Sequence, residues 1–192
     1  MLNQVDLSSP RLVLRSYRPS DAEVIWEAVE ETRPSLVRWV PDIGRQQTPS
    51  AVHAALVGLA CQQQRGDRVV FGVWERSSDQ FLGEVGVYDV DRGSGIGEVG
   101  YWIRQTAQGH GYATEALRAV LKYVTDELGL RACEAHVASD NHRSRRVAER
   151  LGFDLTGHRA PAPCWDGEVG DVLIYTRAVA PGACRFDPQT AA

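Results

Sequence analysis

The clearest change of hydrophobic period in the chain lies between residues 96 and 128. Residues 96 to 103 are mostly apolar, β-branched or aromatic, which predicts a strand covered on both faces. From Tyr112 onward, apolar residues recur every three or four positions with charged residues between them, which predicts a long amphipathic helix. Its apolar stripe consists of Ala113, Ala116, Leu117, Val120, Leu121, Val124 and Leu128.

The rest of the pattern predicts antiparallel strands first and crossover connections later. Ser20 and Glu23 predict a capping box that starts the first helix, over residues 21 to 31. A second short helix is expected from Pro34 to Val40. The other expected helices cover residues 49 to 65 and 143 to 151. The expected strands cover residues 11–17, 69–74, 81–90, 96–103, 132–137, 153–158 and 169–179. Helices packed on a mixed sheet of this kind predict an α/β (α+β) domain.

Length and composition favour a single domain. The chain has 192 residues, 43% of them hydrophobic, which is enough for one substantial core. We expect this domain to cover residues 1–180 and the remaining segment, residues 181–192, to be a mobile tail with little to bury.

Charge and cysteine usage restrict the partners. The net charge is -4 without a run of basic residues, so a nucleic-acid partner is not expected. No run of eighteen apolar residues and no signal peptide are seen, so we expect a soluble cytoplasmic protein without a membrane partner. The four cysteines lie far apart and form no CxxC, which favours reduced thiols over disulfides or a metal site.

Gly109 and Gly111 lie where the strand gives way to the central helix. Glycine allows a sharp turn and lets a ligand approach bare N–H groups, and the first turn of a helix adds unpaired donors at the positive end of its dipole. We therefore interpret Gln108 to Ala113 as a diphosphate-binding loop. One alternative is that the glycines serve only the turn. A dinucleotide-binding G-x-G-x-x-G loop fits less well, because Thr114 occupies the place of the third glycine.

Three short tracts carry a resemblance to a known family. Gln108, Gly111 and Ala113 form Q-x-x-G-x-A, which resembles the acyl-CoA-binding signature of the GNAT superfamily of N-acetyltransferases. The surrounding QGHGYATEAL resembles the RimJ/RimL-type branch in particular. Two later tracts resemble the same branch, one through Asn141, Ser144, Gly152 and Phe153, the other through Gly167, Asp171 and Tyr175.

The resemblance implies a fold and a co-substrate. GNAT domains have a six- or seven-stranded mixed sheet with about four helices, and the sheet splays open between its fourth and fifth strands, here residues 96–103 and 132–137. Acetyl-CoA is expected in that gap, with its amide-bearing arm paired to the free strand edge. The expected acetyl-CoA contacts are Trp102, Ile103, Gln108, Gly109, His110, Gly111, Tyr112, Ala113 and Asn141. Asn141 is equally suited to capping the helix that follows it.

Direct acetyl transfer needs a group that takes a proton from the amine and a donor for the leaving thiolate. Glu98 is the candidate base, because it lies in an apolar strand where a half-buried carboxylate is suited to proton uptake. A residue that faces solvent beside the Gly95 turn is the alternative. Ser144 is the candidate thiolate donor by resemblance, since Ala148 stands where many GNAT enzymes carry a tyrosine.

The acceptor is less defined. Trp26, Trp39 and Trp165 fall in segments that border the acceptor pocket in this family, although core packing is an alternative use for them. Pro163 occupies the place of a glutamate proposed as base in RimL-like enzymes, which favours a small primary amine as acceptor. A protein N-terminus, as in ribosomal-protein acetyltransferases, and a non-catalytic acyl-CoA-binding module are the alternatives. The sequence does not define the oligomeric state, and a homodimer is compatible with it.

Overall fold

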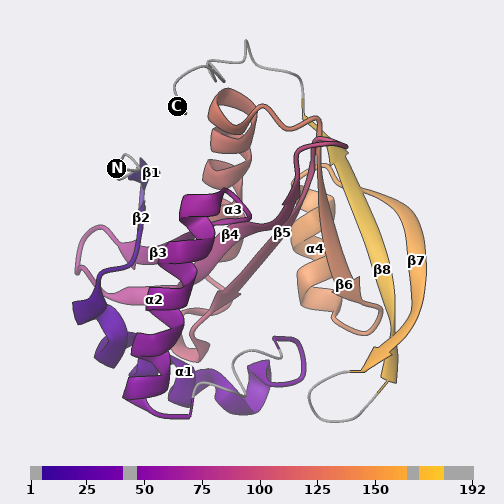
Figure 1. Cartoon of the computed structure of the whole chain (residues 1–192). Helices are drawn as coiled ribbons and strands as arrows, with labels where there is room; N and C mark the ends of the chain where they lie inside the picture. Colours follow the sequence, from indigo (N-terminus) through magenta and orange to yellow (C-terminus); the bar gives the residue numbers. More distant parts are fainter. Residues whose placement is uncertain (1–5, 41–46, 164–168, 180–192) are drawn as a thin grey trace.

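The computed structural model describes residues 6–40, 47–163 and 169–179, and it has one eight-stranded mixed sheet with helices on both faces (Figure 1). The strand order is β1-β2-β3-β4-β5-β6-β8-β7. The strands are β1 (Leu7–Ser8), β2 (Leu12–Arg15), β3 (Val69–Glu75), β4 (Phe81–Asp91), β5 (Ile96–Ile103), β6 (Ala132–Ala138), β7 (Asp154–Pro163) and β8 (Val169–Ala178). The helices are α1 (Ala22–Leu36), α2 (Pro49–Arg65), α3 (Tyr112–Tyr123) and α4 (His142–Arg150), with short helical turns η1 (Pro19–Asp21), η3 (Gln105–Ala107) and η4 (Val124–Leu128).

The α/β fold class and the mixed sheet are confirmed, and the expected strand number is slightly wrong. The eighth strand is β1, which has only two residues and pairs with β2 at Leu7↔Leu14 and Ser8↔Val13. Two residues cannot show an alternating pattern, so this strand could not be predicted from hydrophobic periodicity. The expected tail, residues 181–192, lies outside the described residues.

The first helix differs from the prediction at both ends. Ser20 is not its cap, because Asp21 lies at the N-cap position. The Asp21 carboxylate accepts a hydrogen bond of 2.7 Å from the Arg18 backbone N–H and forms an ion pair of 2.8 Å with Arg15. Helix α1 then continues through Pro34 to Leu36, so the separate helix expected from Pro34 to Val40 is absent from the described chain. Because Pro34 lies in the last turn, the loss of its N–H removes only one terminal hydrogen bond.

The central feature of the sheet is the separation of β5 from β6. These parallel strands pair only at Ile96↔Ala132, Gly97↔Cys133 and Glu98↔Glu134. Figure 1 shows them diverging beyond this point, while β5 remains paired with β4 and β6 with β8. Along the rest of β5, every second residue therefore directs its N–H and C=O groups toward a gap. This confirms the expected splay.

Two hydrophobic clusters pack helices against the sheet. The larger one packs α3, through Leu117, Val120 and Leu121, against the sheet, and the smaller one packs α1 against β3, β4 and β5. In the smaller cluster the ring centroids of Phe81 and Trp102 are 5.8 Å apart. This contact with Phe81 fixes the position of the Trp102 ring. Among the described residues, no helix has both the length and the apolar character needed to cross a bilayer.

Close packing between β4 and β5 yields the first prediction. Gly83 has φ of +149°, and a Cβ atom at this position would lie 2.1 Å from the Trp102 carbonyl oxygen. We expect Gly83→Ala to lower the free energy of unfolding by about 3 kcal/mol, measured by urea denaturation. The control is Gly58→Ala in α2, where a Cβ would meet nothing within 4 Å and should stabilise the helix by roughly 1 kcal/mol. Equal urea midpoints for the two variants would contradict this packing.

Candidate active site

A cavity of about 770 Å³ lies where β5 and β6 separate. Its walls come from α2, the segment after α1, β4, β5, β6, α4 and β7. Five residues predicted from the sequence line it: Trp39, Glu98, Trp102, Asn141 and Ser144. The structure thus brings together side chains from three widely separated parts of the chain.

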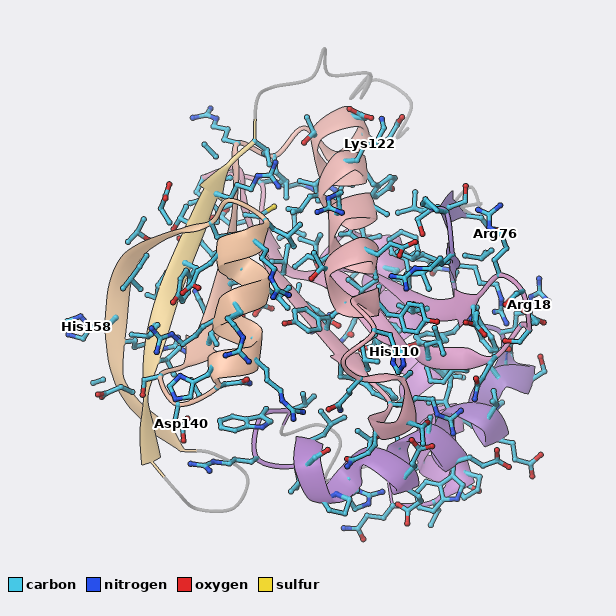
Figure 2. All side chains as sticks on the ribbon, turned by 180° about the vertical axis from the view of Figure 1, so that it is seen from behind. Arg18, Arg76, His110, Lys122, Asp140 and His158 are labelled. Carbon is cyan, nitrogen blue, oxygen red and sulfur yellow. The ribbon has the colours of Figure 1, made fainter. Side chains whose placement is uncertain are left out.

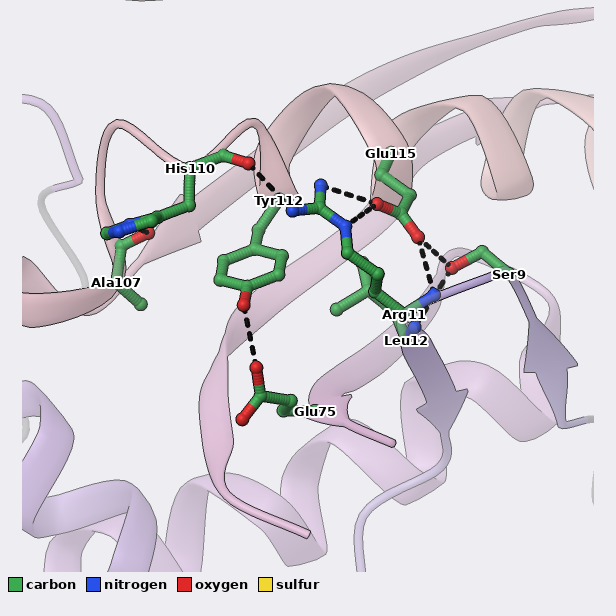
Figure 3. Close-up of polar contacts among 8 residues, drawn as sticks. All are labelled: Ser9, Arg11, Leu12, Glu75, Ala107, His110, Tyr112 and Glu115. Atoms are coloured by element: carbon green, nitrogen blue, oxygen red, sulfur yellow. Dashed lines mark hydrogen bonds and ion pairs between the residues drawn. The ribbon is translucent and has the colours of Figure 1, made fainter. Parts of the chain in front are cut away.

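The loop between β5 and α3 is held from outside by side chains (Figure 3). Arg11 donates a hydrogen bond of 3.0 Å to the His110 carbonyl and one of 2.7 Å to the Glu115 carboxylate. Tyr112 donates through its hydroxyl to Glu75 at 2.7 Å. The loop and the first turn of α3 are therefore tied to β3 and to Arg11, the residue before β2.

The inner side of this loop is suited to an anion. Gly109 and Gly111 have φ of +85° and +80°, and no side chain among the described residues caps the start of α3. A Cβ on Gly109 would meet nothing within 4 Å, so the space beside it is open. Uncapped N–H groups at a helix N-terminus with open space in front of them fit a diphosphate.

The Gln108 side chain makes hydrogen bonds to two other parts of the fold. Its amide nitrogen donates to the Ile103 carbonyl at 3.0 Å, and its amide oxygen accepts from Arg143 at 3.0 Å. Gln108 therefore links the end of β5 to α4. Its backbone N–H donates to the Gln105 carbonyl at 3.2 Å, so this residue has no unpaired amide for a diphosphate, and its predicted contact stays a prediction.

Ser144 is placed by two neighbours. Its Oγ accepts a hydrogen bond of 3.1 Å from the Tyr101 hydroxyl, and its backbone N–H donates to the Asn141 side chain at 3.1 Å. Burial raises the pKa of the Tyr101 phenol, so it remains a donor at neutral pH. Because the Ser144 oxygen accepts from Tyr101, its own hydroxyl hydrogen is available to the cavity. Asn141 is the cap of α4, and its predicted contact with acetyl-CoA stays a prediction.

Glu98 lines the cavity from the last position at which β5 pairs with β6. Its side chain is 34% exposed, and its Oε2 lies 2.9 Å from Nδ1 of His136 in β6. The described part of the chain holds no His, Cys, Asp and Glu cluster suited to a metal ion. Glu98 and Ser144 thus line one cavity from β5 and α4, and their roles as base and proton donor stay predictions.

Comparison with known proteins identifies this arrangement. A model of the acetyltransferase (GNAT) domain matches residues 11–154. The chain belongs to the GNAT acetyltransferase family. It is an acetyl-CoA-dependent N-acetyltransferase, as the three tracts predicted.

Relatives of this GNAT domain include ribosomal-protein enzymes. The [Ribosomal protein uS5]-alanine N-acetyltransferase of Escherichia coli (strain K12) is 29% identical over 173 residues, which cover 89% of each chain. Among solved structures, the RimL ribosomal L7/L12 alpha-N-protein acetyltransferase in complex with coenzyme A superposes with a TM-score of 0.85 at 21% identity, covering 91% of this chain and 98% of that one. The Microcin C7 self immunity acetyltransferase MccE, solved with acetyl-CoA and AMP, has a TM-score of 0.81 at 19% identity and covers 89% and 94%. The RimJ/RimL-like resemblance is confirmed.

The tryptophans expected around the acceptor of the GNAT domain have different surroundings. Trp39 lines the cavity, with the Arg38 guanidinium 4.7 Å from its ring centroid. Trp26 is half-buried in α1 against the smaller hydrophobic cluster, is not among the residues that line the cavity, and lies 5.6 Å from the Arg33 guanidinium. Trp165 lies outside the described residues. The position of Trp39 therefore agrees with a pocket role, and that of Trp26 agrees with the packing alternative.

Sequence reasoning missed a second carboxylate in the cavity of this GNAT domain. Glu84 of β4 accepts hydrogen bonds from the hydroxyls of Tyr17 at 2.7 Å and Tyr88 at 3.0 Å. Burial, with Glu84 nearby, raises the pKa of the Tyr17 phenol well above its usual range. Alternation in β4 could have placed Glu84 on the cavity face, because Glu84 and Trp102 are cross-strand partners.

The glycine loop yields the second prediction. We expect Gly109→Ala to weaken coenzyme A binding about tenfold, because the added methyl group crowds the diphosphate at the loop, and calorimetry can measure this. Gly152→Ala is the matched control: Gly152 has φ of +75°, and its Cβ would also meet nothing within 4 Å. Both variants should lose similar stability. If both also bind coenzyme A as the wild type does, the loop is not the diphosphate site.

Proposed function

We propose that this N-acetyltransferase acetylates the N-terminal amine of a protein, as ribosomal-protein acetyltransferases do. The observation that carries this proposal is the similarity to the uS5-alanine enzyme over 89% of both chains. The relatives favour this acceptor over the small amine suggested by Pro163. Pro163 pairs with Val169 at the edge of the described residues. The small amine remains the second candidate. A ribosomal-protein acceptor agrees with the predicted cytoplasmic location.

The cavity supports an acceptor that enters as an extended chain. Its volume suits the first residues of a peptide, and its α2 wall presents Val52, Leu56 and Leu59. Glu84 of β4, Glu98 of β5 and His136 of β6 line the same cavity. An N-terminal amine can therefore reach Glu98 while the following side chain lies against α2.

The residues of the chain suit direct attack on a thioester, which acetyl-CoA supplies. Glu98 takes the proton from the acceptor amine, and Ser144 donates its hydroxyl proton to the leaving sulfur while Tyr101 hydrogen-bonds to its oxygen. Free N–H groups of β5 beyond Glu98 stabilise the oxygen that becomes negative. No protein nucleophile is needed, because positioning of the two substrates supplies much of the rate.

A coenzyme A release assay with a panel of acceptors tests the acceptor class. We expect turnover with peptides that carry ribosomal-protein N-termini and none with the same peptides after their α-amine is blocked. Turnover with polyamines or amino acids, but with no peptide, would replace the proposal by the small-amine alternative. Binding of acetyl-CoA without turnover on any acceptor would favour the non-catalytic module.

The role of Glu98 is tested by Glu98→Gln. We expect kcat to fall by about two to four orders of magnitude, because the amide cannot accept a proton, while acetyl-CoA affinity measured by calorimetry is unchanged. Glu27→Gln, at an exposed carboxylate of α1, is the control and should leave both quantities unchanged. A Glu98→Gln variant with wild-type kcat would remove this residue from the mechanism.

A further inference from the structure

His136 lies between two carboxylates at the point where the strands separate. Its Nδ1 is 2.9 Å from Glu98 Oε2, and its Nε2 is 3.0 Å from Glu134 Oε2. Each ring nitrogen therefore faces a different carboxylate, which is the geometry of a proton path through an imidazole. The family resemblance assigned no role to His136 or Glu134.

The register of the sheet produces this arrangement. Glu98 and Glu134 are cross-strand partners at the last position where β5 and β6 pair. His136 follows Glu134 by two residues, so both side chains lie on the same face of β6. Beyond this pair the strands separate, which leaves room for the His136 ring beside Glu98.

The three side chains differ in their access to the cavity. Glu98 and His136 line it, whereas Glu134 does not. His136 is the least exposed, at 19%, compared with 34% for Glu98 and 28% for Glu134. A path from Glu98 through His136 to Glu134 therefore leads from the cavity to solvent outside it.

Among the described residues, Glu98 and Glu134 are the charged groups bonded to His136. On β8, Ile174 and Thr176 are the cross-strand partners of His136 and Glu134, and neither carries a charge. The remaining charged residues of the cavity wall are Arg38, Arg68, Glu84 and Arg159. The two bonded carboxylates are thus the groups that hold the ring.

We propose that His136 and Glu134 act through Glu98 as a relay that carries the proton of the acceptor amine out of the cavity. The proposal rests on the role of Glu98 proposed above. Glu98 Oε2 takes the proton as the nitrogen–carbon bond forms and passes it to Nδ1 of neutral His136. The Nε2–H proton then passes to Glu134 and to water. The carbon–sulfur bond breaks with its electron pair on sulfur, which takes the hydroxyl proton of Ser144, and a proton from water restores the Ser144 hydroxyl.

The cluster also defines the direction of the pH dependence. The hydrogen bond to Glu98 raises the pKa of His136, burial lowers it, and Glu134 raises it again, with a net upward shift. Below this pKa the ring already carries both protons and cannot accept another. Catalysis should therefore increase as pH rises through the titration of His136.

The test compares kcat and KM across neutral pH for the wild type, His136→Gln and Glu134→Gln, with a peptide acceptor that the wild type acetylates. We expect His136→Gln to lower kcat roughly tenfold or more and to lose the rising limb assigned to His136, with KM for acetyl-CoA unchanged. Glu134→Gln should also lower kcat, because the relay loses its outer proton acceptor, and should move the limb to lower pH, because one of the two carboxylates that raise the pKa of His136 is gone. His158→Gln is the control: His158 is exposed on β7, and Figure 2 shows it pointing away from the body of the molecule.

NMR titration of the His136 ring gives a second readout that does not need turnover. We expect both Glu98→Gln and Glu134→Gln to lower its titration midpoint, whereas a midpoint unaffected by either change would overturn the relay. A role confined to holding β5 against β6 would lower the thermal stability of His136→Gln and leave its pH profile like that of the wild type. That profile would overturn the relay while acetyl transfer stands. A wild-type chain that acetylates no amine would instead overturn the proposed function, and the relay with it.

Discussion

The structure depends on the loss of pairing between β5 and β6 after Glu98. Parallel strands normally continue their hydrogen-bond ladder, and unpaired backbone groups inside a protein cost free energy. Here the remaining five residues of β5 have no partner in β6, and four of them, Val99 to Trp102, line a cavity. A ligand with amides can satisfy those groups as another strand would, so we expect the opening of the sheet to bind the extended arm of acetyl-CoA.

The glycine loop follows directly from the open strand. A short helical turn separates β5 from the loop, and the Gln108 side chain ties the loop back to the last carbonyl of β5. Arg11 and Tyr112 hold the outside of the loop, so its N–H groups keep their arrangement without a ligand. Such preorganisation lowers the cost of binding, because less of the loop must be ordered when a diphosphate arrives.

Much of the fold could be predicted from the sequence because period and turn residues are local signals. The strand at residues 96–103 and the start of α3 are examples, and both control the site. The two-residue β1 and the continuation of α1 through Pro34 gave no such signal. The hydrogen bond from Tyr101 to Ser144 and the pairing of His136 with Glu98 depend on how distant segments register, which periodicity cannot supply. Glu98 was a candidate because it lies in an apolar strand, and Ser144 was one by resemblance to RimL-like enzymes; the structure places both at the cavity, and their roles stay predictions.

Hydrogen exchange of the backbone amides, with and without acetyl-CoA, tests the central claim most directly. If acetyl-CoA binds along the unpaired part of β5 and at the glycine loop, the amides in β5 after Glu98 and those from Gly109 to Ala113 should both exchange more slowly when acetyl-CoA is present. Unchanged exchange in both segments at saturating acetyl-CoA would contradict the account.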